Sequence, residues 1–201
     1  MAESKTMKKG YVKTQTVVLV VFLAFVAGFF SGIVLTIFKS GGMRPQGVDA
    51  ETAAAMEAAR ERKEQIARLK ALTEKNPGDA EAWTRLGHAY FDDDKPAKAI
   101  EAYRRVLELR PDNADIWTDL GVMYRRNQQP GEAVRAFDRA IGLDPEHEIA
   151  WFNKGVVLIH DLKQVEAGLE AWEALLDVNP MAKAPNGQTV EELINHFREH
   201  V

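Results

Sequence analysis

The residues best suited to chemistry in this sequence are two histidines, His196 and His200. With Glu199 they form the pattern H-x-x-E-H, in which histidines four residues apart on a helix could bind one zinc ion. The pattern falls in the last turn of the chain, where no later residue can supply a third ligand. We therefore interpret these residues as polar side chains on a terminal helix and expect no zinc catalysis.

Other patterns for catalysis or ligand binding are absent from the sequence. Asp92, Asp93 and Asp94 resemble a calcium loop only in charge, because the spaced ligands and the final glutamate of an EF-hand are missing. Neither a phosphate-binding glycine loop nor a nucleophile elbow occurs. Without cysteine there can be no thiolate chemistry and no disulfide bond. The sequence predicts a protein that is not an enzyme and has no metal site, cofactor or catalytic residue.

Charge is distributed unevenly along the 201 residues, whose formal net charge is −4. Residues 1–16 form a basic tail with a net charge of +3, and Lys39 and Arg44 add two further positive charges. Residues 45–201 must therefore carry a net charge of −9. An acidic body argues against nucleic-acid binding, and a basic tail favours a membrane as the partner.

Residues 17–38 form the longest apolar run, with 22 residues and no charge. A helix needs roughly 20 apolar residues to cross a bilayer. A cleavable signal peptide has a shorter apolar region of about 7–15 residues, and no convincing cleavage site follows here. We predict an uncleaved transmembrane helix that holds the chain in the lipid bilayer by a single span.

The basic residues around this span predict its orientation. Four lysines precede it, and only Lys39 and Arg44 follow it closely. Positively charged flanks tend to remain in the cytoplasm. We therefore expect a cytoplasmic amino terminus, with residues 39–201 on the other side of the membrane. In a bacterium this would be the inner membrane, with the body in the periplasm.

Two segments connect the span to the rest of the chain. Residues 39–48 are rich in glycine, with a serine and a proline, and are typical of a flexible linker. Residues 49–76 consist mainly of strong helix formers and predict a lead helix. Its second half, from Ile66 onward, has the better apolar stripe and should pack against the following residues. Its first half should be solvated.

A repeat with a period of 34 residues is the strongest signal in the sequence. Two residue types recur at this step: Trp83, Trp117 and Trp151, and Gly87, Gly121 and Gly155. Self-similarity at a fixed period indicates an array of one supersecondary unit. Each unit has two stretches of helical apolar periodicity separated by a breaker, which predicts pairs of helices.

This pattern resembles the tetratricopeptide repeat family, W-x2-L-G-x2-Y followed by A-x3-F and a closing proline. The first repeat supplies Trp83, Leu86, Gly87, Tyr90, Ala99, Tyr103 and Pro111. The second supplies Trp117, Leu120, Gly121, Tyr124, Ala133, Phe137, Ala140 and Pro145. The third keeps Trp151 and Gly155 and places Gly168 and Trp172 at the Ala and Phe positions. It also contains one extra residue, which we assign to a longer turn between its helices, around residues 161–164.

The resemblance implies an all-α fold in which an α-solenoid follows the N-terminal transmembrane helix. Residues 80–182 would form three helix pairs, at 80–113, 114–147 and 148–182. Residues 183–201 would form a C-terminal capping helix, because they contain a capping box and an end repeat exposes an apolar side.

The resemblance also implies where a partner would bind. In such domains the first helices of the pairs line a concave groove that commonly holds a peptide or a partner helix. Residues spaced to share one helix face give this partner-binding groove: Thr84, His88, Phe91, Thr118, Val122, Arg125, Phe152, Val156 and Ile159. The set changes from polar to apolar, which suggests a partner segment with a charged end and an apolar end. The alternative is that the capping helix covers the residues of the third repeat.

Some relatives clamp free carboxyl-terminal peptides with a lysine and an asparagine in this groove. Thr84 and His88 stand at those places in the first repeat, so we do not expect that mode of binding here.

The order of basic tail, span, linker and repeats looks like that of bacterial cytochrome c maturation factors and of ancillary components of the secretion translocon. It implies a membrane-anchored adaptor that binds protein or peptide partners and assists assembly of a membrane or exported complex. The alternative is a self-associating structural scaffold, possible as a homodimer through Gly28 and Gly32. These glycines form a G-x-x-x-G pattern that lets spanning helices pack closely, although glycine is also frequent in spans that do not associate.

If the spans associate through these glycines, replacing both by isoleucine should separate them. The double variant Gly28→Ile, Gly32→Ile should therefore crosslink to itself in membranes less than the wild-type chain does, because two bulky side chains hold the helices apart. Equal crosslinking of the two proteins would exclude this dimer.

Overall fold

The computed structural model describes residues 49–200 of the chain. The predicted tail, the span with Gly28 and Gly32, and the linker at residues 39–48 all lie outside the described residues. None of the described helices is both long and apolar enough to cross a membrane. The transmembrane helix at residues 17–38 therefore stays a prediction.

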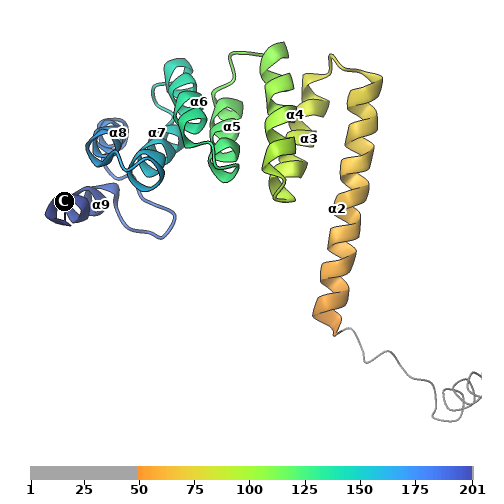
Figure 1. Cartoon of the computed structure of the whole chain (residues 1–201), viewed down its shortest axis with the longest axis horizontal. Helices are drawn as coiled ribbons and strands as arrows, with labels where there is room; N and C mark the ends of the chain where they lie inside the picture. Colours follow the sequence, from red (N-terminus) through yellow and green to blue (C-terminus); the bar gives the residue numbers. More distant parts are fainter. Residues whose placement is uncertain (1–48, 201) are drawn as a thin grey trace, which may run out of the picture. The chain divides into compact units, whose positions relative to one another are not determined.

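The described residues form eight α-helices and one π-helical turn, with no strand beyond an isolated bridge between Lys183 and Thr189. The elements are α2 (Ala50–Lys75), α3 (Ala80–Asp92), α4 (Pro96–Leu109), α5 (Ala114–Arg126), α6 (Pro130–Leu143), α7 (Glu148–Val156), η1 (Val157–Asp161), α8 (Val165–Val178) and α9 (Val190–His200). Helices α3 and α4, α5 and α6, and α7 and α8 pack as pairs, and successive pairs stack in a row (Figure 1). The structure confirms an all-α solenoid.

The recurrent tryptophans fix the start of each first helix. Every indole Nε1–H donates a hydrogen bond to the carbonyl of a proline six residues earlier, at 2.8–3.0 Å: Trp83 to Pro77, Trp117 to Pro111 and Trp151 to Pro145. Asp79 and Asn113 cap the first two of these helices by accepting from backbone amides three residues later. The repeated tryptophan in the sequence therefore corresponds to the same hydrogen-bonded start in each first helix.

The recurrent glycines allow the two helices of each pair to approach closely. A ring from the second helix lies against each glycine of the first: Tyr103 on Gly87, Phe137 on Gly121 and Trp172 on Gly155. A Cβ atom at any of these glycines would lie less than 3.0 Å from the ring. All three rings are buried, so a larger residue in place of the glycine has no space.

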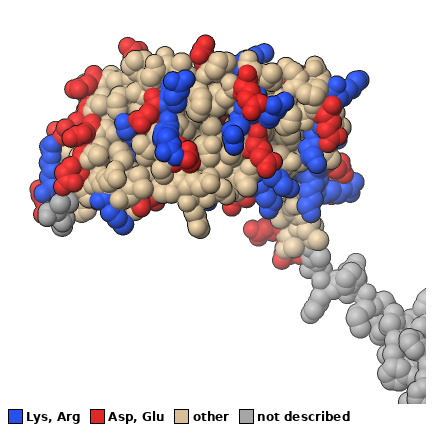
Figure 2. All heavy atoms as spheres, turned by 45° about the horizontal axis from the view of Figure 1, so that its top comes forward, with Lys and Arg blue, Asp and Glu red and all other residues tan. Residues whose placement is uncertain are grey.

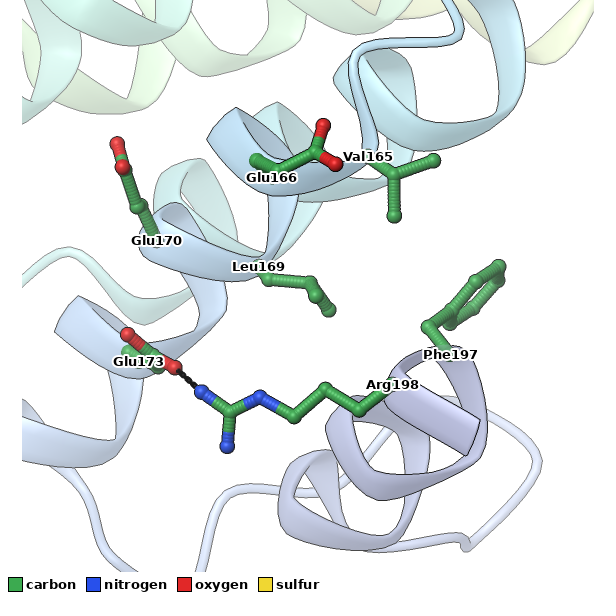
Figure 3. Close-up of a pocket in the computed structure, with 7 residues that line it drawn as sticks. All are labelled: Val165, Glu166, Leu169, Glu170, Glu173, Phe197 and Arg198. Atoms are coloured by element: carbon green, nitrogen blue, oxygen red, sulfur yellow. Dashed lines mark hydrogen bonds and ion pairs between the residues drawn. The ribbon is translucent and has the colours of Figure 1, made fainter. Parts of the chain in front are cut away.

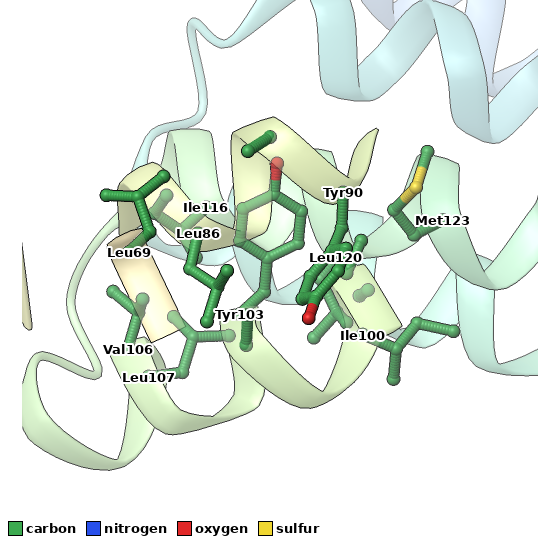
Figure 4. Close-up of a cluster of buried hydrophobic side chains, with 14 residues drawn as sticks. Leu69, Leu86, Tyr90, Ile100, Tyr103, Val106, Leu107, Ile116, Leu120 and Met123 are labelled. Atoms are coloured by element: carbon green, nitrogen blue, oxygen red, sulfur yellow. The ribbon is translucent and has the colours of Figure 1, made fainter. Parts of the chain in front are cut away.

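The largest apolar cluster runs through the first two repeats (Figure 4). It includes Leu86, Tyr103 and Leu120, and also Leu69 from the second half of α2. The predicted packing of the lead helix is thus confirmed at Leu69. Leu72, which also lies in this half of the helix, is 51% exposed, and the neighbouring Thr73 is buried instead.

The extra residue of the third repeat does not lengthen the turn, contrary to our prediction. Gln128 and Lys163 have φ of 59° and 58°, and each stands two residues before a second helix begins. The turns are therefore equally long. The additional residue is absorbed at the end of the first helix, where α7 continues as the π-helical turn η1. Widening the helix by one residue per turn accommodates an insertion without moving the turn.

Helix α9 covers the end of the third pair. Its Val190 and Ile194 are buried in one cluster with Trp172 and Leu175. The predicted capping box is present: the Glu192 amide donates to Thr189 Oγ1 at 3.1 Å, and the Thr189 amide donates to a Glu192 carboxylate oxygen at 2.9 Å.

The ring contact predicts opposite effects for two helical glycines. Gly121→Ala should lower the free energy of unfolding by about 1–3 kcal/mol, because its Cβ would collide with the buried Phe137 ring. The matched variant Gly142→Ala should raise it by about 0.4–1 kcal/mol, since nothing lies within 4 Å of that Cβ. Chemical denaturation of both variants measures the difference. Equal effects at the two positions would contradict this packing.

The burial of α9 predicts that its removal exposes the third pair. Deleting residues 186–201 removes the buried Val190 and Ile194, each worth about 1.5–3 kcal/mol of apolar burial. The shortened protein should aggregate or unfold less cooperatively in a thermal melt followed by circular dichroism. An unchanged melting curve would show that α9 is dispensable.

Candidate protein-binding surface

The first helices of the three pairs lie side by side and are joined by polar contacts. These contacts are His88 to Asp119, Arg126 to Phe91, His147 to Asp115 and Arg125 to Asp161. We refer to the side of α3, α5, α7 and η1 that carries these residues as the inner face. Because the contacts link neighbouring repeats, the inner face is one continuous surface.

The contact between α3 and α5 centres on Asp119. His88 Nε2 lies 3.2 Å from an Asp119 carboxylate oxygen. Burial raises the pKa of Asp119, and the charge of His88 opposes this shift. The nearby Tyr103 hydroxyl is buried, and burial together with the Asp119 charge raises the pKa of Tyr103. Both shifts disfavour the charged forms of Asp119 and Tyr103 themselves.

Two arginines at the end of α5 reach the neighbouring repeats in opposite directions. Arg125 donates to Asp161 of η1 at 2.5 Å. Arg126 stacks on the Phe91 ring, 4.5 Å from its centroid, and lies 3.7 Å from Asp94. These partly exposed pairs contribute modestly to stability, but they fix the positions of the side chains on this surface.

Seven of the nine predicted groove residues are accessible in the structure. His88 is exposed, and six are half-buried: Thr84, Phe91, Val122, Arg125, Phe152 and Val156. Thr118 and Ile159 are only 4% and 3% exposed, so they cannot contact a partner. The prediction from helix periodicity that these two residues line the groove was therefore wrong.

Each of the two buried residues packs against a neighbour that helix periodicity does not reveal. The Thr118 hydroxyl donates to the Ala114 carbonyl at 2.9 Å and lies 3.4 Å from His147 Nε2 at the start of the next pair. Ile159 occupies the space that Gly168 leaves open on α8. Gly168 stands where the first two repeats have alanine. This glycine was the feature of the sequence from which the burial of Ile159 could have been predicted.

The third repeat contributes a recess of about 520 Å³ between α7, η1, α8 and α9. Its apolar lining is Phe152, Val156, Trp172, Leu193 and Phe197, and its polar lining is His160, His196, Asn186 and Gln188. Helix α9 therefore covers the inner-face residues of this repeat only in part. The sequence did not indicate a site at His160 or the 184–188 loop, and it predicted His196 only as a polar side chain of a terminal helix, because none of them belongs to the repeat pattern.

No group of three or more His, Cys, Asp and Glu side chains within the described part of the chain is placed to hold a metal ion. His196 faces the recess, next to the Phe197 ring at 5.7 Å between centroids.

A second hollow, of about 430 Å³, lies between α8 and α9 and is shown in Figure 3. Glu166, Glu170 and Glu173 of α8 line it, and Arg198 of α9 forms an ion pair with Glu173 across it. The three carboxylates against one guanidinium make this hollow acidic.

Charge on the remaining surface is mixed. Lys and Arg side chains alternate with Asp and Glu over the face of the molecule shown in Figure 2. Nucleic-acid-binding surfaces concentrate positive charge, so this face does not have that character.

Two family models match the sequence. Both describe the tetratricopeptide repeat, one over residues 80–113 and the other over residues 102–135. A search of curated proteins gives no match.

Solved structures share the fold at low sequence identity. The crystal structure of MamA aligns with a TM-score of 0.58 and 23% identity, covering 66% of this chain and 75% of that one. The first TPR of Spaghetti (RPAP3), bound to the HSP90 peptide SRMEEVD, aligns with a TM-score of 0.53 and 20% identity, over 60% of this chain and 91% of the other. The Arabidopsis OM64 TPR domain aligns with a TM-score of 0.54 and 17% identity, over 61% and 96%.

At these identities the neighbours show the fold alone and give no support to a role in cytochrome c maturation. The matched repeats and the helix-pair geometry agree with each other. Residues 80–135 thus match models of the tetratricopeptide repeat, and the described helix pairs share the fold of solved tetratricopeptide repeat structures.

Proposed function

We propose that this protein is a membrane-anchored adaptor that binds a protein or peptide partner on its inner face. The observation that carries the proposal is the continuity of this surface. Partly exposed side chains follow one another on α3, α5 and α7, and cross-helix contacts such as Arg125 to Asp161 hold them in place. A fixed surface loses little conformational entropy when a partner binds.

The composition of the inner face also supports a binding role. Phe91 and Phe152 are half-buried aromatic residues, and Arg125 and Arg126 lie between them on α5. Aromatic residues and arginine are enriched in protein interfaces and among the residues that dominate binding energy. The neighbour solved with an HSP90 peptide is an example of the same fold holding a peptide, and it supports the proposal by analogy of fold only.

The anchoring part of the proposal rests on the sequence of residues 17–38. We propose that this span crosses the inner membrane of a bacterial cell and that the repeats are periplasmic. Helix α2, with 26 residues, would then act as a spacer about 40 Å long. Most of its side chains from residue 50 to residue 65 are exposed, as expected of a helix that connects rather than packs.

Site-specific photocrosslinking in intact membranes tests where the partner binds. A photoreactive residue placed at Phe91, Val122 or Val156 should form adducts with the same partner proteins, identified by mass spectrometry. These three positions are half-buried on consecutive first helices.

Matched controls lie on the second helices, one in each repeat. Glu108, Gly142 and Asp177 are exposed and occupy equivalent positions, so photoreactive residues there should give few adducts. Equal adduct formation from both sets, or adducts from the second helices only, would move the binding site away from the inner face.

A further inference from the structure

The floor of the recess between α7, η1, α8 and α9 presents only carbon surfaces to a partner. The rings of Phe152 and Phe197 each lie 5.9 Å from the Trp172 ring, measured between centroids. The single donor of Trp172, its Nε1–H, already bonds the Phe152 carbonyl at 3.0 Å. A polar group buried on this floor would lose its bonds to water without gaining new ones, so the floor favours an apolar side chain.

The rim of the recess has the opposite chemistry. His160, His196, Asn186 and Gln188 lie on it. An imidazole donates a hydrogen bond in either tautomer, and each amide carries an NH₂ group. None of the eleven lining residues is Asp, Glu, Lys or Arg. In an acidic body, a rim with N–H groups and without carboxylates favours an acceptor such as a carboxylate oxygen.

The recess and the acidic hollow both lie beside α9, and they would favour partner segments of different charge. The hollow in Figure 3 presents Glu166, Glu170 and Glu173, which repel a carboxylate and attract a basic side chain. Of the two hollows, the recess is therefore the one in which an acidic partner segment meets no repelling carboxylate.

The position of His160 is a separate pointer to this recess. His160 belongs to η1, the π-helical turn that contains the extra residue of the third repeat. Such turns are frequent at functional sites. Here the turn brings a histidine to the rim, 5.6 Å from the Phe197 ring between centroids.

From these observations we infer that the recess binds a partner segment in which a side chain of leucine or phenylalanine size stands next to an acidic side chain. The apolar side chain contacts the partly exposed rings of Phe152 and Phe197, which pack on the buried Trp172 ring, and the carboxylate accepts hydrogen bonds from the rim. This inference deepens the proposed function and rests on it, because Phe152 and Val156 belong to both the recess and the inner face.

Fluorescence anisotropy with short labelled peptides tests this chemistry on the purified full chain in mild detergent, with empty micelles as the blank. The probe is an acetylated, amidated peptide with a central Leu-Phe-Glu. Peptides with Ser-Ser-Glu or Leu-Phe-Lys at the centre should bind at least about tenfold more weakly, because each lacks one of the two contacts. Equal affinity for the Glu and Lys peptides would overturn the inference.

A pair of matched variants separates this inference from the proposed function. Val156→Trp fills the recess and should weaken binding of the Leu-Phe-Glu peptide at least about tenfold. Glu101→Trp introduces the same side chain at an exposed position of α4, outside both the recess and the inner face, and should change this affinity less than about threefold. If partner crosslinking on the inner face persists but Val156→Trp binds the peptide normally, the recess inference fails and the adaptor function stands. If the inner face gives no partner crosslinks and the wild-type chain does not bind the peptide, the recess inference and the proposed adaptor function both fail.

A charge reversal of the rim provides an independent check. The double variant His160→Glu, His196→Glu should prefer the Leu-Phe-Lys peptide, because two carboxylates now face the bound segment. An unchanged preference for the Glu peptide would contradict a rim that recognises the carboxylate. Tight binding of the Lys peptide to the wild-type chain, lost in Glu166→Gln, Glu170→Gln, would assign binding to the acidic hollow instead.

Discussion

The contact of an aromatic ring with a helical glycine determines the geometry on which the rest of the structure depends. In each pair the ring fills the space that a Cβ would need, so the two helices approach to a distance that no other residue in place of glycine permits. The Trp-to-Pro hydrogen bonds then fix how the next pair begins. Together these contacts align the first helices, and an aligned set of first helices is what makes an inner face.

The repeats could be predicted well because their defining residues contact each other. Glycine, the ring sixteen or seventeen residues later and the tryptophan recur in the sequence because the same contacts recur in space. The pairing of Gly155 with Trp172 followed from the sequence even though the third repeat departs from the pattern. The capping box at Thr189 followed from local hydrogen-bonding rules.

The candidate site was harder to predict because accessibility depends on contacts outside the repeat. Helix periodicity places Thr118 and Ile159 on the right face of their helices, but His147 and the space above Gly168 bury them. The recess arises from η1, α9 and the loop before it, none of which follows the 34-residue period. Neither His160 nor His196 therefore had a positional counterpart in the first two repeats to mark it.

The π-helical turn has a consequence for how such an array can change. A one-residue insertion in a straight helix rotates everything beyond it by about 100°, which would separate α8 from the helices it packs against. In η1 the added residue is taken up within one turn, and Lys163 still adopts the same turn conformation as Gln128. The first helix of the last repeat can thus change its local shape without rotating the helix that follows it. One repeat can therefore gain a residue while the helices of the array keep their packing.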